Sequence, residues 1–95
     1  MKLGRYEKAM LLALAQREIP LSFSELIKET AKFLPRVYLN TIYFYPANRL
    51  VSEGFVEEKQ KGKGGKVFFK LTPKGKWAVS QITGGLPIKN FEERR

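Results

Sequence analysis

Residues 50–76, LVSEGFVEEKQKGKGGKVFFKLTPKGK, contain the pattern that decides the fold of this chain. Gly54 stands where the C-terminal end of a helix favours a left-handed residue. Two short β-strands are predicted after it, at residues 55–60 and 66–71, and every other residue of the second is apolar. The lysine- and glycine-rich tip at 61–65 must turn the chain between them. We expect these side chains to face the core: Phe55, Val56, Val67, Phe69 and Leu71.

A further helix is predicted directly after this hairpin, over residues 73–82. Thr72 supplies a side-chain cap, and Pro73 suits the first helical position. We expect the inward face of this helix to contain Trp77, Ala78 and either Gln81 or Ile82. Glycines 84 and 85 end it, and the tail at 86–95 is too short for an assigned element. The tail either docks on a partner subunit or frays.

Two helices are predicted on the N-terminal side of the hairpin. Residues 5–16 are strong helix formers and apolar on most sides, so this helix is either deeply buried or shared with a second subunit. After a short extended segment at 19–21, Ser22 and Glu25 have the spacing of a capping box, with Ser24 as a competing cap. The second helix continues to about residue 33. Its inward face is expected to contain Phe23, Leu26, Ile27 and Thr30, with Phe33 or Leu34 beyond them.

A third helix is predicted to begin between residues 38 and 40 and to reach Glu53. Its inward face is expected to contain Tyr43, Ala47 and Leu50. Pro46 conflicts with this helix, because a proline in a helix interior removes a hydrogen bond and clashes with an earlier carbonyl, at a cost of about 3 kcal/mol. We therefore expect either a kink or a helix that begins later than Asn40.

The composition is that of a basic protein with one domain. Its 95 residues carry a formal charge of +9, which favours a nucleic acid or another anionic surface as the partner. No acidic residue occurs from Lys59 to Phe91. A chain of this length buries only about 60–65% of its unfolded surface, so we also expect a partner subunit.

Other classes of function are disfavoured by residue types that the sequence lacks. It has no cysteine and no histidine, which removes thiolate metal sites and the commonest general base. All nine acidic residues are glutamates, and their spacing does not indicate a metal site. We therefore expect no cofactor, no metal and no enzymatic activity. The sequence has neither a signal peptide nor the roughly 20 apolar residues of a membrane span, so we expect a cytoplasmic protein.

Two short motifs indicate a family. They are Leu50-x-x-Glu53-Gly54-Phe55-Val56 before the hairpin and Leu71-Thr72-x-x-Gly75 after it. Over residues 22–79 the chain resembles winged-helix transcriptional regulators of the MarR and PadR type, and it is similar to small dimeric winged-helix proteins of archaeal viruses. The resemblance implies an α+β fold, the winged helix-turn-helix, with a three-helix core, a two-stranded β wing and a C-terminal helix. It implies a DNA-binding domain at 1–85, followed by the tail.

The chain departs from the PadR pattern in two places. The Tyr45-Pro46 pair resembles one found inside the PadR recognition helix, but it lies one residue late when counted back from Leu50. The long C-terminal dimerisation helix of PadR proteins is also missing. We therefore expect a homodimer that forms through the helix at 5–16 together with the fourth helix or the tail.

Winged-helix resemblance implies that the third helix enters the major groove and that the wing reaches the flanking backbone or minor groove. The expected base-reading residues point away from the core: Asn40, Thr41, Phe44, Tyr45, Asn48 and Arg49. Asparagine can bond adenine and arginine can bond guanine in two places each. Alternatively, Phe44 and Tyr45 cover the second helix, and Arg49 neutralises the dipole at the end of the third.

Phosphate contacts are expected from the wing and from the turn before the third helix. The candidates are Arg36, Lys61, Lys63 and Lys66. Lysine is a flexible point charge, which gives affinity with little sequence reading. The alternative is a solvated hairpin whose charge only keeps the protein soluble. Lys74 and Lys76, on the last helix, either add to these phosphate contacts or are simply solvated, as lysines on a helix surface usually are.

The function that these features favour is sequence-specific binding of double-stranded DNA by a homodimeric transcriptional regulator. A protein-interaction winged helix that docks on the transcription machinery remains the alternative, because Ile42, Phe44 and Tyr45 make the outer face of the third helix apolar. RNA binding ranks lower, since the chain lacks the surface aromatic motif of an RRM and the loop of a KH domain.

Overall fold

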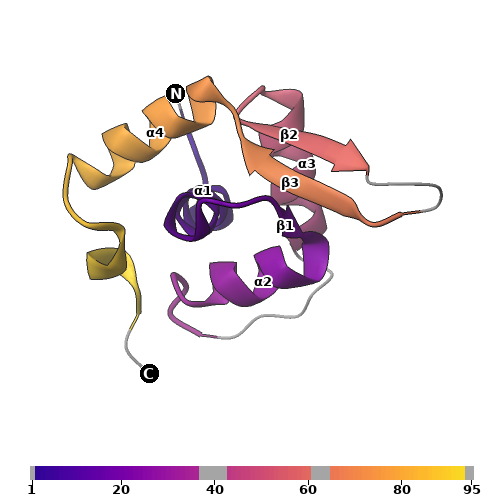
Figure 1. Ribbon diagram of the computed structural model, residues 1–95. Coiled ribbons are helices and arrows are strands. Elements are labelled where there is room, and N and C mark those ends of the chain that lie inside the picture. Colours follow the sequence, from indigo (N-terminus) through magenta and orange to yellow (C-terminus); the bar gives the residue numbers. More distant parts are fainter. Residues whose placement is uncertain (1, 37–42, 61–64, 94–95) are drawn as a thin grey trace.

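The computed structural model describes residues 2–36, 43–60 and 65–93 (Figure 1). Its elements follow the predicted order of helices and strands. They are α1 (Arg5–Arg17), β1 (Leu21–Ser22), α2 (Phe23–Ala31), α3 (Phe44–Ser52), β2 (Val56–Gln60), β3 (Val67–Leu71), α4 (Pro73–Thr83) and the 3-10 helix η2 (Ile88–Phe91).

Helix α1 lies at the centre of the molecule, between α2 on one side and α4 on the other (Figure 1). Six consecutive residues, Ala9 to Leu14, are each at most 5% exposed. They are covered by α2, α3, α4, β3 and η2 of the same chain. The first of the two expectations for this helix, deep burial, is therefore the one that the structure shows. A second subunit cannot use these apolar side chains as its contact surface.

The sheet has three strands in the order β1-β3-β2, with both neighbouring pairs antiparallel. The hairpin pairs Val56 with Leu71 at its base and Gln60 with Val67 near its tip. The short extended segment predicted before α2 becomes β1, so the sheet has one strand more than the two-stranded wing. The expected core residues of the hairpin are buried, with one exception. Val67 is 38% exposed, because the tip extends beyond the helices that cover the base.

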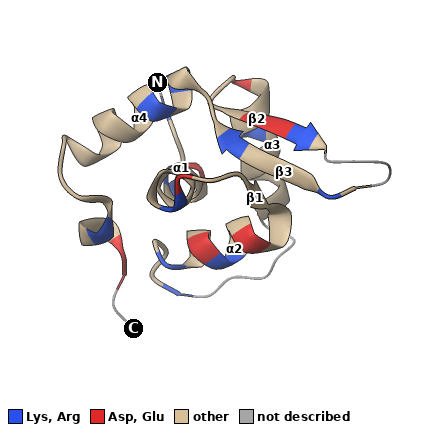
Figure 2. Cartoon of the chain, viewed as in Figure 1, with Lys and Arg blue, Asp and Glu red and all other residues tan. Residues whose placement is uncertain are grey.

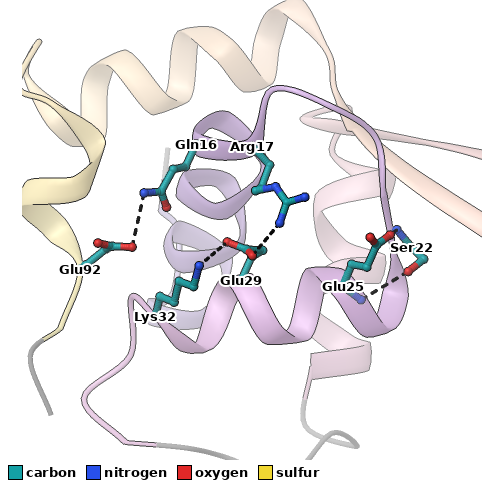
Figure 3. A network of polar contacts seen from close by, with 7 residues as sticks. All are labelled: Gln16, Arg17, Ser22, Glu25, Glu29, Lys32 and Glu92. Atoms are coloured by element: carbon teal, nitrogen blue, oxygen red, sulfur yellow. Dashed lines mark hydrogen bonds and ion pairs between the residues drawn. The ribbon is translucent and has the colours of Figure 1, made fainter.

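Helix α2 begins with the predicted capping box (Figure 3). The Glu25 N–H donates to the Ser22 hydroxyl at 3.3 Å, and the Ser22 N–H donates to the Glu25 carboxylate at 3.0 Å. The backbone bond from Ser22 is the main reason that the pKa of Glu25 lies below its ordinary value of 4.5. Leu26, Ile27 and Thr30 are buried as expected.

The far end of α2 is joined to the end of α1 by an ion pair between Glu29 and Arg17 (Figure 3). Glu29, whose side chain is 9% exposed, accepts a hydrogen bond from Arg17 at 2.9 Å and pairs with Lys32 at 3.1 Å. A buried carboxylate is costly unless it is paired. The pair with Arg17 therefore holds the ends of the two helices together, whereas the pair with Lys32 lies within the end of α2.

Helix α3 resolves the conflict at Pro46 by beginning at Phe44, later than Asn40. Pro46 is then the third helical residue, in the first turn, where the backbone N–H has no partner within the helix and its absence costs little. Tyr43, Ala47 and Leu50 are buried as predicted.

The two sequence motifs meet where α4 begins. The Thr72 N–H donates to the Phe55 carbonyl at 3.1 Å, and the Thr72 hydroxyl accepts the Gly75 N–H at 3.1 Å. A Cβ on Gly75 would collide with that Phe55 carbonyl oxygen, so glycine is what allows α4 to lie this close to the hairpin. Lys74 is exposed, and its ammonium also donates to the Glu53 carbonyl at 2.6 Å and lies over the Phe55 ring.

The contact at Gly75 also fixes the rotation of α4. Gly75, Ala78 and Val79 are buried, and Trp77 is on the opposite side of the helix with 51% of its surface exposed. The prediction that Trp77 lies in the core is therefore wrong. Gln81 is exposed and Ile82 is partly buried, so the second alternative for that position is correct.

The tail docks on its own chain, which corrects the expectation that it joins a partner or frays. Ile88 and Phe91 pack against the core. The Glu93 N–H donates to the Lys32 carbonyl at 2.7 Å, and Gln16 donates to the Glu92 carboxylate at 3.3 Å (Figure 3). The tail thus crosses the ends of both α1 and α2.

Candidate nucleic-acid interface

The outer face of α3 is formed by the residues that do not pack on α1. Tyr45 is 78% exposed and Phe44 is 55% exposed, and their rings meet edge to face at 6.0 Å between centroids. Asn48 and Arg49 are also exposed. The alternative that Phe44 and Tyr45 cover α2 does not fit these exposures. Both rings instead present apolar surface to the outside.

Ser52 belongs to the same face, although it was not among the predicted site residues. It is exposed, it lies one turn beyond Asn48, and its hydroxyl donates to the Arg49 carbonyl at 3.0 Å. The helical spacing that selected Asn48 also reaches Ser52 and could have identified it.

A groove of about 510 Å³ separates α3 from the wing. Its walls come from the start of α2, the outer side of α3 and the hairpin. Most of the lining is apolar, and it contains Phe23, Phe44, Ala47, Asn48, Glu58, Lys66, Val67 and Phe69. Phe23 and Phe69 form its floor, with their rings 6.1 Å apart. Among the described residues that line the groove, Glu58 carries one negative charge and Lys66 one positive charge.

Arg49 points away from this groove, toward the start of α1. Its Nε lies 3.3 Å from the Glu7 carboxylate, in an ion pair without the geometry of a hydrogen bond, and Nη2 donates to the Lys2 carbonyl at 3.4 Å. The other Glu7 oxygen accepts the Gly4 N–H at 2.8 Å and caps α1. The Glu7 side chain is 7% exposed, whereas that of Arg49 is 56% exposed. Arg49 therefore connects the outer face of α3 to a buried acid.

The charge of the wing is mixed (Figure 2). Lys66 and Lys70 on the β3 side are exposed, but β2 carries Glu57 and Glu58, and Lys59 lies 4.0 Å from Glu57. Arg36 is exposed beyond the end of α2. The base of the wing is therefore less basic than the sequence from Lys59 onward suggests.

Four predicted site residues lie outside the described residues. They are Asn40, Thr41, Lys61 and Lys63. Of the remaining six, Phe44, Asn48 and Lys66 line the groove, and Tyr45 lies against Phe44. Arg49 lies beside Glu7, and Arg36 is exposed beyond the end of α2.

Over residues 2–36, 43–60 and 65–93, no cluster of three or more acidic, histidine or cysteine side chains could hold a metal ion. Within the same residues, no helix is both long enough and apolar enough to cross a membrane.

Comparison with solved structures identifies the fold. BpsR of Bordetella bronchiseptica, whose DNA binding is regulated by 6-hydroxynicotinic acid, superposes with a TM-score of 0.70 at 22% identity. The match covers 87% of this chain but only 54% of BpsR, so the chain spans about half the length of that protein. F-93 of the archaeal virus SSV1 superposes with a TM-score of 0.61 at 25% identity, over 94% of this chain and 88% of F-93. No family model and no curated protein sequence matches. The chain therefore has the winged helix-turn-helix fold, as its resemblance to MarR-type regulators and to winged-helix proteins of archaeal viruses predicted.

Proposed function

We propose that this protein binds double-stranded DNA with sequence specificity, as a cytoplasmic homodimeric transcriptional regulator. One observation carries most of the proposal: the outer face of α3 is exposed on a winged-helix scaffold whose formal charge is +9. In this fold the corresponding helix enters the major groove. The DNA binding named for BpsR agrees with this proposal.

The proposed contacts divide into two groups. Base reading is assigned to the outer face of α3 and the residues before it: Asn40, Thr41, Phe44, Tyr45, Asn48 and Arg49. Phosphate contact is assigned to the turn before α3, at Arg36, and to three lysines of the wing: Lys61, Lys63 and Lys66. Arg49 has guanidinium N–H groups beyond those that face Glu7 and Lys2, and these can reach guanine or a phosphate.

The proposed DNA-binding domain is residues 1–85, and the proposed dimer forms through α4 or through the tail at 86–95. Helix α1 was expected to contribute, but its apolar residues are covered within one chain. Exposed apolar surface is present instead on α4 at Trp77, 51% exposed, and after it at Leu86, 58% exposed.

Selection of bound duplexes from a random pool tests the proposal directly. A palindrome with half-sites about one helical turn apart is expected from a two-fold dimer. Recovery of unrelated sequences at background level would contradict sequence-specific binding.

The salt dependence of binding tests its electrostatic part. If six phosphates are contacted, log K should fall against log salt with a slope of about −5. A slope near zero would mean that phosphate contacts contribute little.

A second candidate function is docking on a protein of the transcription machinery. The exposed Phe44 and Tyr45 favour it, because aromatic residues are common anchors of protein interfaces. Pull-down from an extract with and without nuclease separates the two functions. A partner that survives nuclease treatment and is lost on Tyr45→Ala supports docking on a protein.

A further inference from the structure

The groove between α3 and the wing is unsuited to a phosphate group. Glu58 and Lys66 contribute opposite charges to its lining, and the rest of the lining is mostly apolar. Glu25, at the start of α2 near the groove, is occupied by the Ser22 N–H. A phosphate placed against this lining would meet the Glu58 carboxylate as well as the Lys66 ammonium, whereas an apolar group would meet mostly apolar side chains.

The aromatic rings beside the groove are unusual for a surface helix. Phe44 and Tyr45 are adjacent, and each has more than half of its surface exposed. Val67, 38% exposed, extends the apolar surface from the wing side. Exposed apolar patches of this kind mark interaction sites, and the one apolar group on the major-groove edge of DNA is the C5 methyl of thymine.

We infer that the wing-side edge of α3 reads thymine methyl groups in the major groove, with Phe44 as the contact residue and Tyr45 packed against it. This inference rests on the proposed DNA binding and names the base that the site selects. Phenylalanine is among the side chains that contact this methyl group, and such a contact requires no charge in the groove.

Asn48 is the second residue on this edge of α3 that we assign to base contact, and its distance from Phe44 is set by the helix. It lies one helical turn further along the same edge and also lines the groove. Four residues of helix rise about 6 Å, which is close to two base-pair steps of about 3.4 Å. Asparagine bonds the adenine edge in two places. The wing-side edge of α3 therefore selects A·T pairs about two steps apart.

Uracil substitution tests the inference, because deoxyuridine differs from thymidine only by the missing methyl group. The duplex recovered by random-pool selection is remade with each thymine replaced in turn by uracil, and Kd is measured for each version. Loss of one buried methyl should weaken binding about fourfold at one or two positions. Bromouracil, whose bromine is close to a methyl group in size, should restore the affinity.

Phe44→Ala identifies the contact residue. The variant should bind the thymine and uracil duplexes equally at the sensitive positions, and Phe44→Leu should keep part of the difference. Phe44 is 55% exposed, so both variants should retain the circular dichroism spectrum of the folded protein. Ile19→Ala is the matched control, since Ile19 is 51% exposed but lies between α1 and β1, and it should keep the full thymine preference.

Three results would overturn the inference. Equal binding of thymine and uracil duplexes by the unchanged protein would exclude methyl reading while leaving DNA binding intact. A thymine preference that persists in folded Phe44→Ala would exclude Phe44 as the reader. Failure of the random pool to yield any bound sequence would overturn the proposed function, and the inference with it, before any uracil is introduced.

Discussion

Arg49 is the residue at which the proposed recognition surface and the core of the protein meet. Its partner Glu7 is buried and also caps α1, so the pair joins the exposed face of α3 to the start of the central helix. Removal of the arginine would leave a buried carboxylate oxygen without a counter-charge, which is more costly than the loss of an exposed ion pair.

Arg49→Ala should therefore lower the free energy of unfolding, by about 1 kcal/mol, because the arginine itself is half exposed. Urea denaturation measures this loss. In a Glu7→Gln background the same substitution should cost less, since no buried charge is left unpaired. An equal cost in both backgrounds would show that Glu7 and Arg49 are not coupled.

For Gly75→Ala, the contacts around residue 75 and helix propensity predict opposite effects on stability. Alanine is favoured over glycine inside a helix by about 1 kcal/mol. At residue 75, however, the added Cβ would meet the Phe55 carbonyl oxygen and lie 2.9 Å from Cδ2 of Leu71. Gly75→Ala should thus destabilise the fold, by about 1–3 kcal/mol as measured by denaturant unfolding.

Ser80→Ala is the control on the same helix, because Ser80 is exposed. It should change the free energy of unfolding by no more than about 0.5 kcal/mol. A Gly75→Ala protein as stable as the unchanged chain would mean that α4 can move away from the hairpin at no cost.

The start of α2 should make stability depend on pH. The pKa of Glu25 is lowered in the folded protein, chiefly by the Ser22 N–H. A lowered pKa in the folded state means that the ionised carboxylate stabilises the fold. This contribution is complete above the ordinary pKa of 4.5 and is lost as the pH falls through the folded value.

Glu25→Gln isolates this contribution, since glutamine can still accept the Ser22 N–H but does not titrate. Between about pH 7 and pH 3, the thermal midpoint of the variant should fall less than that of the unchanged protein. Identical curves would assign the acid sensitivity to other carboxylates.

The elements that could be predicted from sequence are those with local signals. The capping box at Ser22, the cap at Thr72 and the glycine at 54 each act within a few residues, and all three are confirmed. The late start of α3, at Phe44, was one of two alternatives for the conflict at Pro46, because proline limits where a helix can begin but does not choose between a late start and a kink.

The errors arose where a distant contact decides the outcome. Trp77 was expected on the inward face of its helix, but the approach of Gly75 to Phe55 rotates it outward. The candidate site shows the same limit. Helical spacing correctly placed Phe44, Tyr45 and Asn48 on the outer face of α3, whereas the pairing of Arg49 with Glu7 depends on how α1 packs against α3.

At the scale of the whole molecule, the proposed dimer can be followed through the chain's single tryptophan. Trp77 is half exposed in one chain and lies on the α4 surface that we assign to the dimer. Its fluorescence emission should shift to shorter wavelength as the protein concentration rises and the side chain leaves water. Leu86→Glu should abolish the shift, whereas Tyr45→Glu, on the α3 face, should leave it unchanged.

A concentration-independent spectrum, together with a constant sedimentation coefficient, would contradict a dimer through α4. A shift that Tyr45→Glu removes would instead move the interface to α3 and would conflict with the DNA-binding role of that face.

The central position of α1 also determines the order in which parts of the protein should unfold locally. Amide hydrogens exchange with solvent through local or global unfolding. Those in the most buried elements exchange only when the whole protein unfolds. Residues 9–14 are covered on all sides by the chain's own elements, so their amides should be the slowest to take up deuterium. Helix α3 buries only Ala47 and Leu50, and its amides should exchange earlier. The helix that we assign to base reading can thus adjust its conformation while the centre of the molecule remains closed.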